Sequence, residues 1–424
     1  MKILVAVLCA TWTWMATAAP VAITADRMVD VVEGKVINQA VIVVDGNKIL
    51  AAGQARSVNV PQGARVIALG DHTLMPGLMD MHVHLTSDAT KHGYKRLSVS
   101  LPRATITGVK HARQTLEAGF TTVRNVGAPG FADVALRDAI DEGDVPGPRM
   151  FVAGPSLGVT GGHCDSNLLP YEFHEKSEGV ADGPWEVRKA VRRNIKYGAT
   201  VIKFCATGGV LSKGTKVGAQ QYTQQEMKAL IEEAHLRGLT VATHAHGTSG
   251  IKTAIRAGVD SVEHGSLLDD EAIALAKEHG TYFSMDVYVT EYILNEGAKA
   301  GILEESLAKE RTVGKQQRDN FRKAVEAGVN MVFGSDAGVY PHGDNPKQFA
   351  RMVKFGMSPM QAIQAATINA ATLLKQQDNL GSLSPGKYAD IVAIPGNPLQ
   401  DMSKMEQVSM VMKDGDVVLN RLKM

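Results

Sequence analysis

The chain has 424 residues, 44% of them hydrophobic, which is enough to bury a large core with a smaller satellite domain beside it. Lysine and arginine total 45 against 44 acidic residues, so the formal charge is +1, and no basic run stands out. This balance argues against binding to nucleic acid or to an anionic membrane surface, and we expect a small-molecule partner instead.

The first 19 residues have the pattern of a secretory signal peptide. Lys2 precedes an apolar run from Ile3 to Met15, and small residues follow up to position 19. The apolar run is too short to span a bilayer comfortably, and no other segment approaches transmembrane length. The sequence therefore predicts export, to the periplasm or the medium, after cleavage behind Ala18 or Ala19. A retained N-terminal anchor is the alternative.

Both ends of the chain hold short β-branched runs separated by turn residues. Within residues 20–75, Asp45-Gly46 lies between two such runs and predicts a hairpin. Residues 377–424 repeat the pattern. Neither segment is large enough to fold alone, so we predict one small composite β-sandwich domain built from both termini.

Residues 76–376 alternate strand-like runs with amphipathic, helix-like stretches, and several of these stretches end at a glycine just before the next strand. Eight such units in about 300 residues predict a (β/α)8 TIM barrel, an α/β fold, with a doubly wound open sheet as the main alternative. Residues 287–320 exceed an ordinary connection and predict an extra helical element over the barrel mouth or at a subunit contact. The expected barrel strands are residues 77–85, 121–126, 150–154, 201–205, 240–244, 261–264, 282–286 and 331–336.

Six candidate metal ligands stand at the carboxyl ends of five of these strands, where the active sites of such barrels lie. His82 and His84 share one face of the first strand, because alternate side chains of a strand point the same way. The others are Lys203, His244, His264 and Asp336. Each has an ordinary alternative as a rim lysine, a core histidine or a helix cap, but all of these would have to hold at once at one barrel end.

Lys203 is the odd member of this set, because a lysine ammonium cannot bind a metal. A lysine that carries CO2 as a carbamate becomes a carboxylate on a long arm and could bridge two cations. The six residues together resemble the amidohydrolase superfamily, in particular its binuclear zinc branch with a carboxylated lysine. More narrowly, four segments resemble the branch that holds Xaa-Pro and Xaa-Arg/Lys dipeptidases and ochratoxin-hydrolysing amidohydrolases, namely residues 160–165, 203–209, 244–247 and 262–265.

The resemblance implies two zinc ions, or other divalent metals, at these ligands. His82, His84 and Asp336 would hold the more buried ion, His244 and His264 the more exposed one, and the Lys203 carbamate would bridge them. A metal-bridging hydroxide would attack the substrate, with Asp336 as the general acid and base that passes a proton to the leaving nitrogen.

The activity that the resemblance implies is carboxypeptidase-like or dipeptidase-like. The enzyme would cleave the amide bond of N-acyl amino acids or dipeptides. Ochratoxin A, cleaved to ochratoxin alpha and phenylalanine, is one expected substrate. The resemblance also implies a homo-oligomer, with an octamer as one form.

Three other functions stay open at this point. They are a cyclic-amide hydrolase of the imidazolonepropionase kind, a deaminase, and a non-catalytic binding protein on the same barrel. A deaminase would need a catalytic glutamate beside the ligand of the fifth or sixth strand. Glu263 is the nearby carboxylate, but as the neighbour of His264 we expect it on the opposite face of the strand.

Substrate binding has four candidates. His163 follows a flexible Thr-Gly-Gly after the third strand, and His246 lies two residues past His244, so either could bind the substrate carbonyl or its carboxylate. Tyr222 and Arg124 are weaker candidates. For all four, the alternative is a role in orienting a metal ligand.

Residues outside the constellation have simpler expected roles. Cys164 and Cys205 could pair in an exported protein, but the sequence does not give their distance, and free thiols on the barrel rim are the favoured interpretation. Trp185 is assigned to packing. Surface or loop positions are expected for the other histidines, namely His72, His92, His111, His174, His235, His279 and His342.

Overall fold

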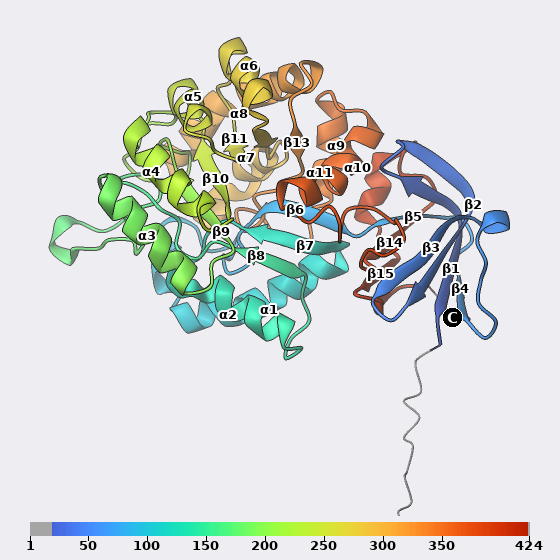
Figure 1. Cartoon of the computed structure of the whole chain (residues 1–424). Helices are drawn as coiled ribbons and strands as arrows, with labels where there is room; N and C mark the ends of the chain where they lie inside the picture. Colours follow the sequence, from blue (N-terminus) through green and yellow to red (C-terminus); the bar gives the residue numbers. More distant parts are fainter. Residues whose placement is uncertain (1–18, 423–424) are drawn as a thin grey trace, which may run out of the picture.

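The computed structural model describes residues 19–422, which form a barrel with a mixed β-sheet at one side (Figure 1). The predicted signal peptide lies almost wholly outside the described residues. In the part of the chain that the structure describes, no helix combines the length and the apolar character needed to cross a membrane.

The mixed sheet is built from both ends of the chain, as predicted. Its strands run in the order β16-β15-β14-β5-β1-β2-β3, with β4 paired to β1. Their inward side chains share one core, to which Ile23 and Ile42 contribute from one terminus and Ile391 and Met410 from the other. The expected hairpin joins β2 to β3, and its turn contains Gly46 with a positive φ of 55°. The strands are β1 Val21–Asp30, β2 Lys35–Asp45, β3 Lys48–Gln54, β4 Arg65–Ala68, β5 His72–Pro76, β14 Ile391–Pro395, β15 Met410–Lys413 and β16 Asp416–Asn420.

The chain enters the barrel directly after Pro76, and the eight predicted barrel strands are all present. Strands β6 to β8 and β9 to β13 form two parallel sheets. Parallel bridges from Leu157 to Phe204 and from Val83 to Ala337 join the sheets at both edges, so the barrel is closed and the open-sheet alternative is excluded. The strands are β6 Leu78–Val83, β7 Phe120–Asn125, β8 Arg149–Val152, β9 Val201–Cys205, β10 Thr240–Ala245, β11 Ser261–His264, β12 Tyr282–Ser284 and β13 Met331–Val332.

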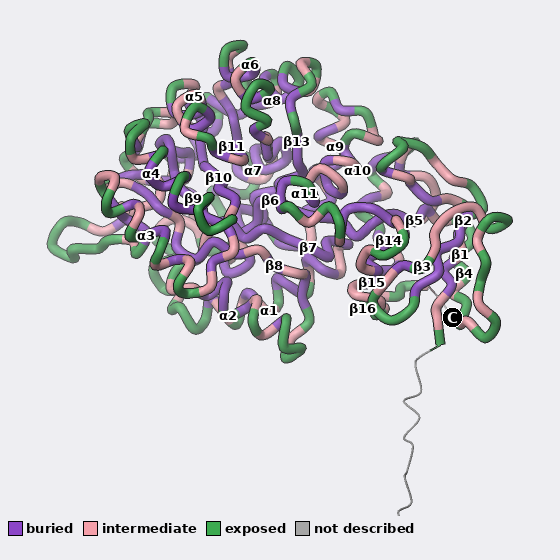
Figure 2. The backbone as a smooth tube through the Cα atoms, viewed as in Figure 1, coloured by how far each residue is buried: buried purple, intermediate pink, exposed green. Residues whose placement is uncertain are grey.

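Helices surround the barrel and leave a buried centre, drawn purple in Figure 2. Helix α4 begins at Gln224, and its N-terminus has a capping box in which the side chains of Thr223 and Glu226 each bond the other's backbone N–H. The helices are α1 Leu101–Glu117, α2 Ala132–Asp141, α3 Pro184–Lys196, α4 Gln224–His235, α5 Thr248–Arg256, α6 Asp270–His279, α7 Val289–Ala300, α8 Glu304–Glu326, α9 Lys347–Lys354, α10 Pro359–Ala365 and α11 Ile368–Leu373. Short 3₁₀ helices span Ala55–Ser57, Gly93–Ser98, Pro129–Phe131, Tyr171–Phe173 and Met402–Glu406.

The long segment after β12 forms α7 and the first turns of α8, so the prediction of an extra helical element is confirmed. Ile293 of α7 and Ser306, Glu310 and Gln317 of α8 line the central cavity at the barrel mouth. This element therefore covers the end of the barrel at which the candidate ligands lie.

Two expectations about single residues are wrong. Cys164 and Cys205 are paired in a disulfide, because the loop after β8 brings their Cα atoms to 5.9 Å. Trp185 does not pack, because the first turn of α3 faces solvent and leaves the residue 83% exposed.

Candidate metal centre

Two histidines and an aspartate meet where the first and last barrel strands lie side by side. Asp336 Oδ1 lies 3.3 Å from His82 Nε2 and 3.5 Å from His84 Nε2. Asp336 has a positive φ of 58°, a region that an aspartate enters at small cost and that turns its carboxylate toward the two imidazoles. These three donors could hold one divalent cation.

A buried carboxylate below this group joins the same two strands. Asp80 Oδ1 accepts hydrogen bonds from the backbone N–H of His82 at 3.1 Å and of Ser335 at 3.0 Å. Asn345 donates to Asp80 Oδ2 at 2.8 Å. Burial raises the pKa of Asp80 to about 6 although these bonds oppose the shift. The residue fixes the spacing between His82 and Asp336.

A second group of donors comes from the carboxyl ends of β10 and β11. One ligand atom from each of His244, His246 and His264 lies within 4.8 Å of the others. The same limit holds for His264, Asp286 and Asp336, so Asp336 stands between the two groups. His264 has a φ of 70°, which turns its ring inward at the end of its strand.

Lys203 brings a long side chain into the same buried space. Its Nζ and the Nε2 of His244 are buried and have no hydrogen-bond partner among the described residues. Burial lowers the pKa of Lys203 to about 8, which makes the neutral amine, the form that adds CO2, accessible near neutral pH. Buried polar atoms without partners are costly, so these orphaned donors fit a carbamate and divalent cations.

In four of these imidazoles, Nδ1 lies close to an oxygen atom of a neighbouring backbone or side-chain group. His84 Nδ1 lies 3.2 Å from the Gly127 carbonyl and His246 Nδ1 2.7 Å from Ser266 Oγ. His264 Nδ1 lies 3.0 Å from both oxygens of Asp286, and His82 Nδ1 lies 3.2 Å from Glu263 Oε2. Contacts of this kind aim the Nε2 atoms into the centre.

Electrostatics keep most of these rings neutral, as metal binding requires. Burial lowers the pKa of His84 to about 4 and holds those of His82, His244 and His246 well below the ordinary value. His264 differs, because Asp286 outweighs the effect of burial and raises its pKa.

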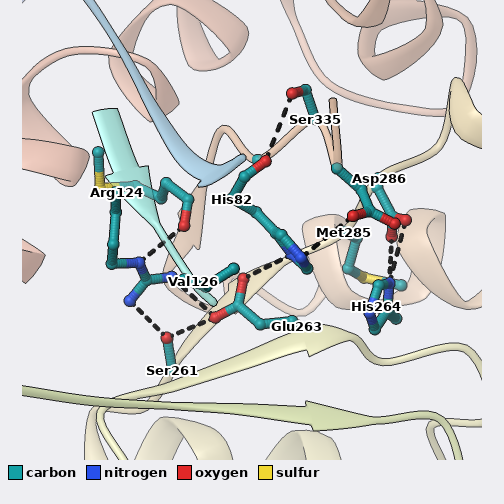
Figure 3. Close-up of polar contacts among 12 residues, drawn as sticks. His82, Arg124, Val126, Ser261, Glu263, His264, Met285, Asp286 and Ser335 are labelled. Atoms are coloured by element: carbon teal, nitrogen blue, oxygen red, sulfur yellow. Dashed lines mark hydrogen bonds and ion pairs between the residues drawn. The ribbon is translucent and has the colours of Figure 1, made fainter. Parts of the chain in front are cut away.

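Glu263 does not lie where the sequence places it. Strict alternation sends it to the outside of the barrel, but it points inward with Ser261, its partner on the same strand face. Alternation fails because His264 is in the left-handed region, so that two successive side chains face the barrel interior. Arg124 ion-pairs with Glu263 at 2.7 Å (Figure 3). Arg124, His82 and Lys203 outweigh burial and hold the pKa of Glu263 well below its usual range.

This site can be compared with known proteins. Residues 73–418 match the profile described as the amidohydrolase family. The chain belongs to the amidohydrolase family. The resemblance drawn from the sequence motifs is therefore confirmed.

Three relatives illustrate the match of this amidohydrolase. Ochratoxinase of Aspergillus niger is 34% identical over 354 residues, which cover 79% of this chain and 72% of that protein. The crystal structure of a Xaa-Pro dipeptidase with methionine bound in its active site has a TM-score of 0.90 at 41% identity and covers 95% of this chain and all of that one. A prolidase complexed with N-methylphosphonate-L-proline has a TM-score of 0.86 at 31% identity, with 95% and 100% coverage.

The cavity of the amidohydrolase has a volume of about 850 Å³ and includes all six candidate ligands in its wall. His163 also lines it, with its ring stacked on His244 at 3.9 Å and its Nδ1 2.8 Å from Ser212 Oγ. Burial lowers the pKa of His163 to about 3. His246 lies in the wall as well. Both histidines can therefore reach a substrate in the cavity.

The two weaker candidates lie outside the cavity wall. The Tyr222 hydroxyl donates to the Ala181 carbonyl at 3.0 Å and turns away from the ligands. Arg124 is fully buried beneath the site and donates to the Met81 carbonyl, Ser261 Oγ and Glu263 Oε1. Direct contact with substrate does not fit either position, which leaves the alternative role in supporting the site.

Asp286 was not among the predicted site residues, and two histidines lie elsewhere than predicted. Asp286 closes the seventh predicted strand, and that position at a barrel strand end was the signal that could have identified it. His111 and His342 are buried rather than on the surface, with rings stacked at 4.5 Å. They pack there because they bond the carbonyls of Leu85 and His84 behind the first strand.

Proposed function

We propose that this amidohydrolase is a metal-dependent enzyme that cleaves the amide bond of N-acyl amino acids or dipeptides and releases the C-terminal residue. One observation carries the proposal. Two groups of metal donors line one cavity together with the buried amine of Lys203, which has no hydrogen-bond partner among residues 19–422. The ochratoxinase and prolidase relatives support the choice of an amide as the bond that is cleaved.

The donor residues can be divided between two cations. His82, His84 and Asp336, which lie close enough together for this, would hold one cation. His244 and His264 would hold the other, with the carbamate of Lys203 between the two cations. Imidazole and carboxylate donors suit zinc. When bound, the two cations would acidify a water molecule and polarise the scissile carbonyl.

The chain's own side chains would bind the substrate and move the proton. Asp336 takes a proton from the attacking water and delivers it to the leaving nitrogen, which an amide needs because its amine leaves poorly without one. In the metal-free site, burial raises the pKa of Asp336 to about 8. His163 and His246 hydrogen-bond the substrate carbonyl or its free carboxylate.

Three finer points belong to the same proposal. Ochratoxin A, with phenylalanine as the released residue, is one specific substrate, which the ochratoxinase relative supports. Export through residues 1–19 would place the enzyme in the periplasm or the medium. The enzyme would assemble into a homo-oligomer, with an octamer as one form, and light scattering would measure the mass of the assembly.

The test is a substrate panel read by the masses of both products. It contains N-acyl amino acids, dipeptides, ochratoxin A, hydantoins and lactams, each assayed after zinc loading. We expect turnover of open-chain substrates that carry a free C-terminal carboxylate. Activity confined to cyclic amides would refute the proposal, and so would fewer than one zinc ion per chain in the loaded protein.

A further inference from the structure

An ion pair is buried beneath the metal centre. The side chains of Arg124 on β7 and Glu263 on β11 are both 0% exposed, and Arg124 Nη2 lies 2.7 Å from Glu263 Oε1. The guanidinium also donates to the Met81 carbonyl at 2.7 Å and to Ser261 Oγ at 2.9 Å. Arg124 on β7 is thereby tied to β6 and β11, and it holds Glu263 in place from the side opposite His82 (Figure 3).

The second carboxylate oxygen of Glu263 faces a ligand. Oε2 lies 3.2 Å from His82 Nδ1, and neither atom has any other partner or a fully aligned hydrogen bond within residues 19–422. A neutral imidazole carries one proton. With that proton on Nδ1 toward Glu263, Nε2 keeps its lone pair, and this is the nitrogen that faces Asp336. The carboxylate therefore selects the tautomer that can bind a cation.

Fold stability alone does not account for this pair. Removing two charges from water is costly, and a well-packed apolar pair of the same volume is often as stable. The geometry offers another reason, because Oε1 is bonded by Arg124 and Ser261 while Oε2 is left for His82. A carboxylate that orients a metal-bound histidine affects metal affinity by about 10- to 100-fold.

We propose that Glu263 is a positioning residue of the metal centre, which fixes the tautomer and orientation of His82, and that Arg124 holds Glu263 in place. The inference rests on the metal centre of the proposed function. Asp286 occupies the corresponding position behind His264 and is supported by Gln317 at 2.9 Å.

The decisive variant is E263Q. Arg124 can only donate, so the glutamine oxygen stays with Arg124 and its NH₂ group faces His82 Nδ1. Nδ1 must then accept, which moves the imidazole proton to Nε2 and blocks that nitrogen as a ligand. We measure zinc affinity by competition with a chromophoric chelator, in an H244A background that leaves the His82 group as the intact donor set.

In this background E263Q should weaken zinc binding about 10- to 100-fold. In an H84A background, which leaves the donors of the other group, the same change should alter affinity less than threefold. E233Q is the matched control, because Glu233 is a buried carboxylate paired with Arg192 at 2.8 Å away from the cavity. It should leave zinc affinity unchanged in both backgrounds.

The double variant R124Q/E263Q covers the case in which the single variant does not fold, since it removes both buried charges together. It should show the same loss of affinity in the H244A background. Equal weakening in both backgrounds, or no weakening in the H244A background, overturns the inference. Zinc content of the unmodified protein is measured alongside: fewer than one ion per chain refutes the proposed function itself, whereas two ions with an unaffected E263Q variant refute only the role of Glu263.

Discussion

Replacement of Asp336 by asparagine separates proton transfer from metal binding. The side chain keeps its shape, and its amide oxygen can occupy the position of Oδ1, which faces His82 and His84 at 3.3 and 3.5 Å. The NH₂ group replaces the other oxygen and cannot accept a proton. D336N therefore removes the proton carrier while it preserves most of the geometry.

The expected loss in kcat follows from this chemistry. Proton transfer by a positioned side chain contributes about 10²- to 10⁴-fold. That range corresponds to about 3 to 5 kcal/mol of transition-state stabilisation, since each tenfold change in rate is about 1.4 kcal/mol.

The assay compares two substrates that share an acyl group. An amide releases an amine that must be protonated, whereas an aryl ester releases a phenolate that leaves without a proton. D336N should lose at least about 100-fold on the amide and clearly less on the ester. Zinc content serves as the control. A variant that retains near-normal turnover of the amide refutes the role given to Asp336. Equal loss of both activities with two zinc ions bound refutes its delivery of a proton to the leaving nitrogen.

Four further outcomes are expected. K203A should abolish turnover and reduce bound zinc from two ions to at most one, measured by elemental analysis, because the bridging group is lost. Reduction of the Cys164–Cys205 disulfide opens a 41-residue loop next to His163, so KM should rise. The unfolding free energy should fall by about 2 to 4 kcal/mol. Unchanged kinetics of a protein whose two free thiols are verified by mass would contradict this. Burial raises the pKa of Glu310 from 4.5 to about 7, so between these values the native state binds a proton that the unfolded state does not. The unfolding free energy should therefore fall by about 3 kcal/mol as the pH rises from 4 to above 7. Denaturant titrations of E310Q should show no such dependence of unfolding free energy on pH. W185S should change the unfolding free energy by less than about 0.5 kcal/mol, because the side chain is exposed; a larger loss would indicate a contact elsewhere.

Local sequence patterns predicted the barrel well. Each of the eight strand-like runs became a barrel strand, because its β-branched and apolar residues lie between helices and turn glycines. The glycines before the strands, such as Gly119 and Gly198, adopt the positive φ that a helix C-terminus favours, 97° at both positions. Spacing along the chain carries this information, so no knowledge of distant contacts was needed.

Side-chain direction at strand ends could not be predicted in this way. Period-two alternation placed Glu263 outside the barrel, but the left-handed backbone at His264 brought both residues inside. Arg124 was only a weaker candidate for substrate binding, and a charged side chain is rarely buried without a partner. Its burial depends on a carboxylate that is 139 positions away in the sequence.

The sequence by itself determined the fold class, the family and the six candidate ligands. It could do so because parallel strands of a barrel end at one rim, and residues at those ends meet there whatever the loops do. Only the tertiary structure decided which groups support the ligands: the carboxylates Glu263 and Asp286, the pairing of Cys164 with Cys205, and the buried stack of His111 and His342. These contacts join residues that are distant in sequence, and their geometry depends on backbone angles and loop paths that no local pattern encodes.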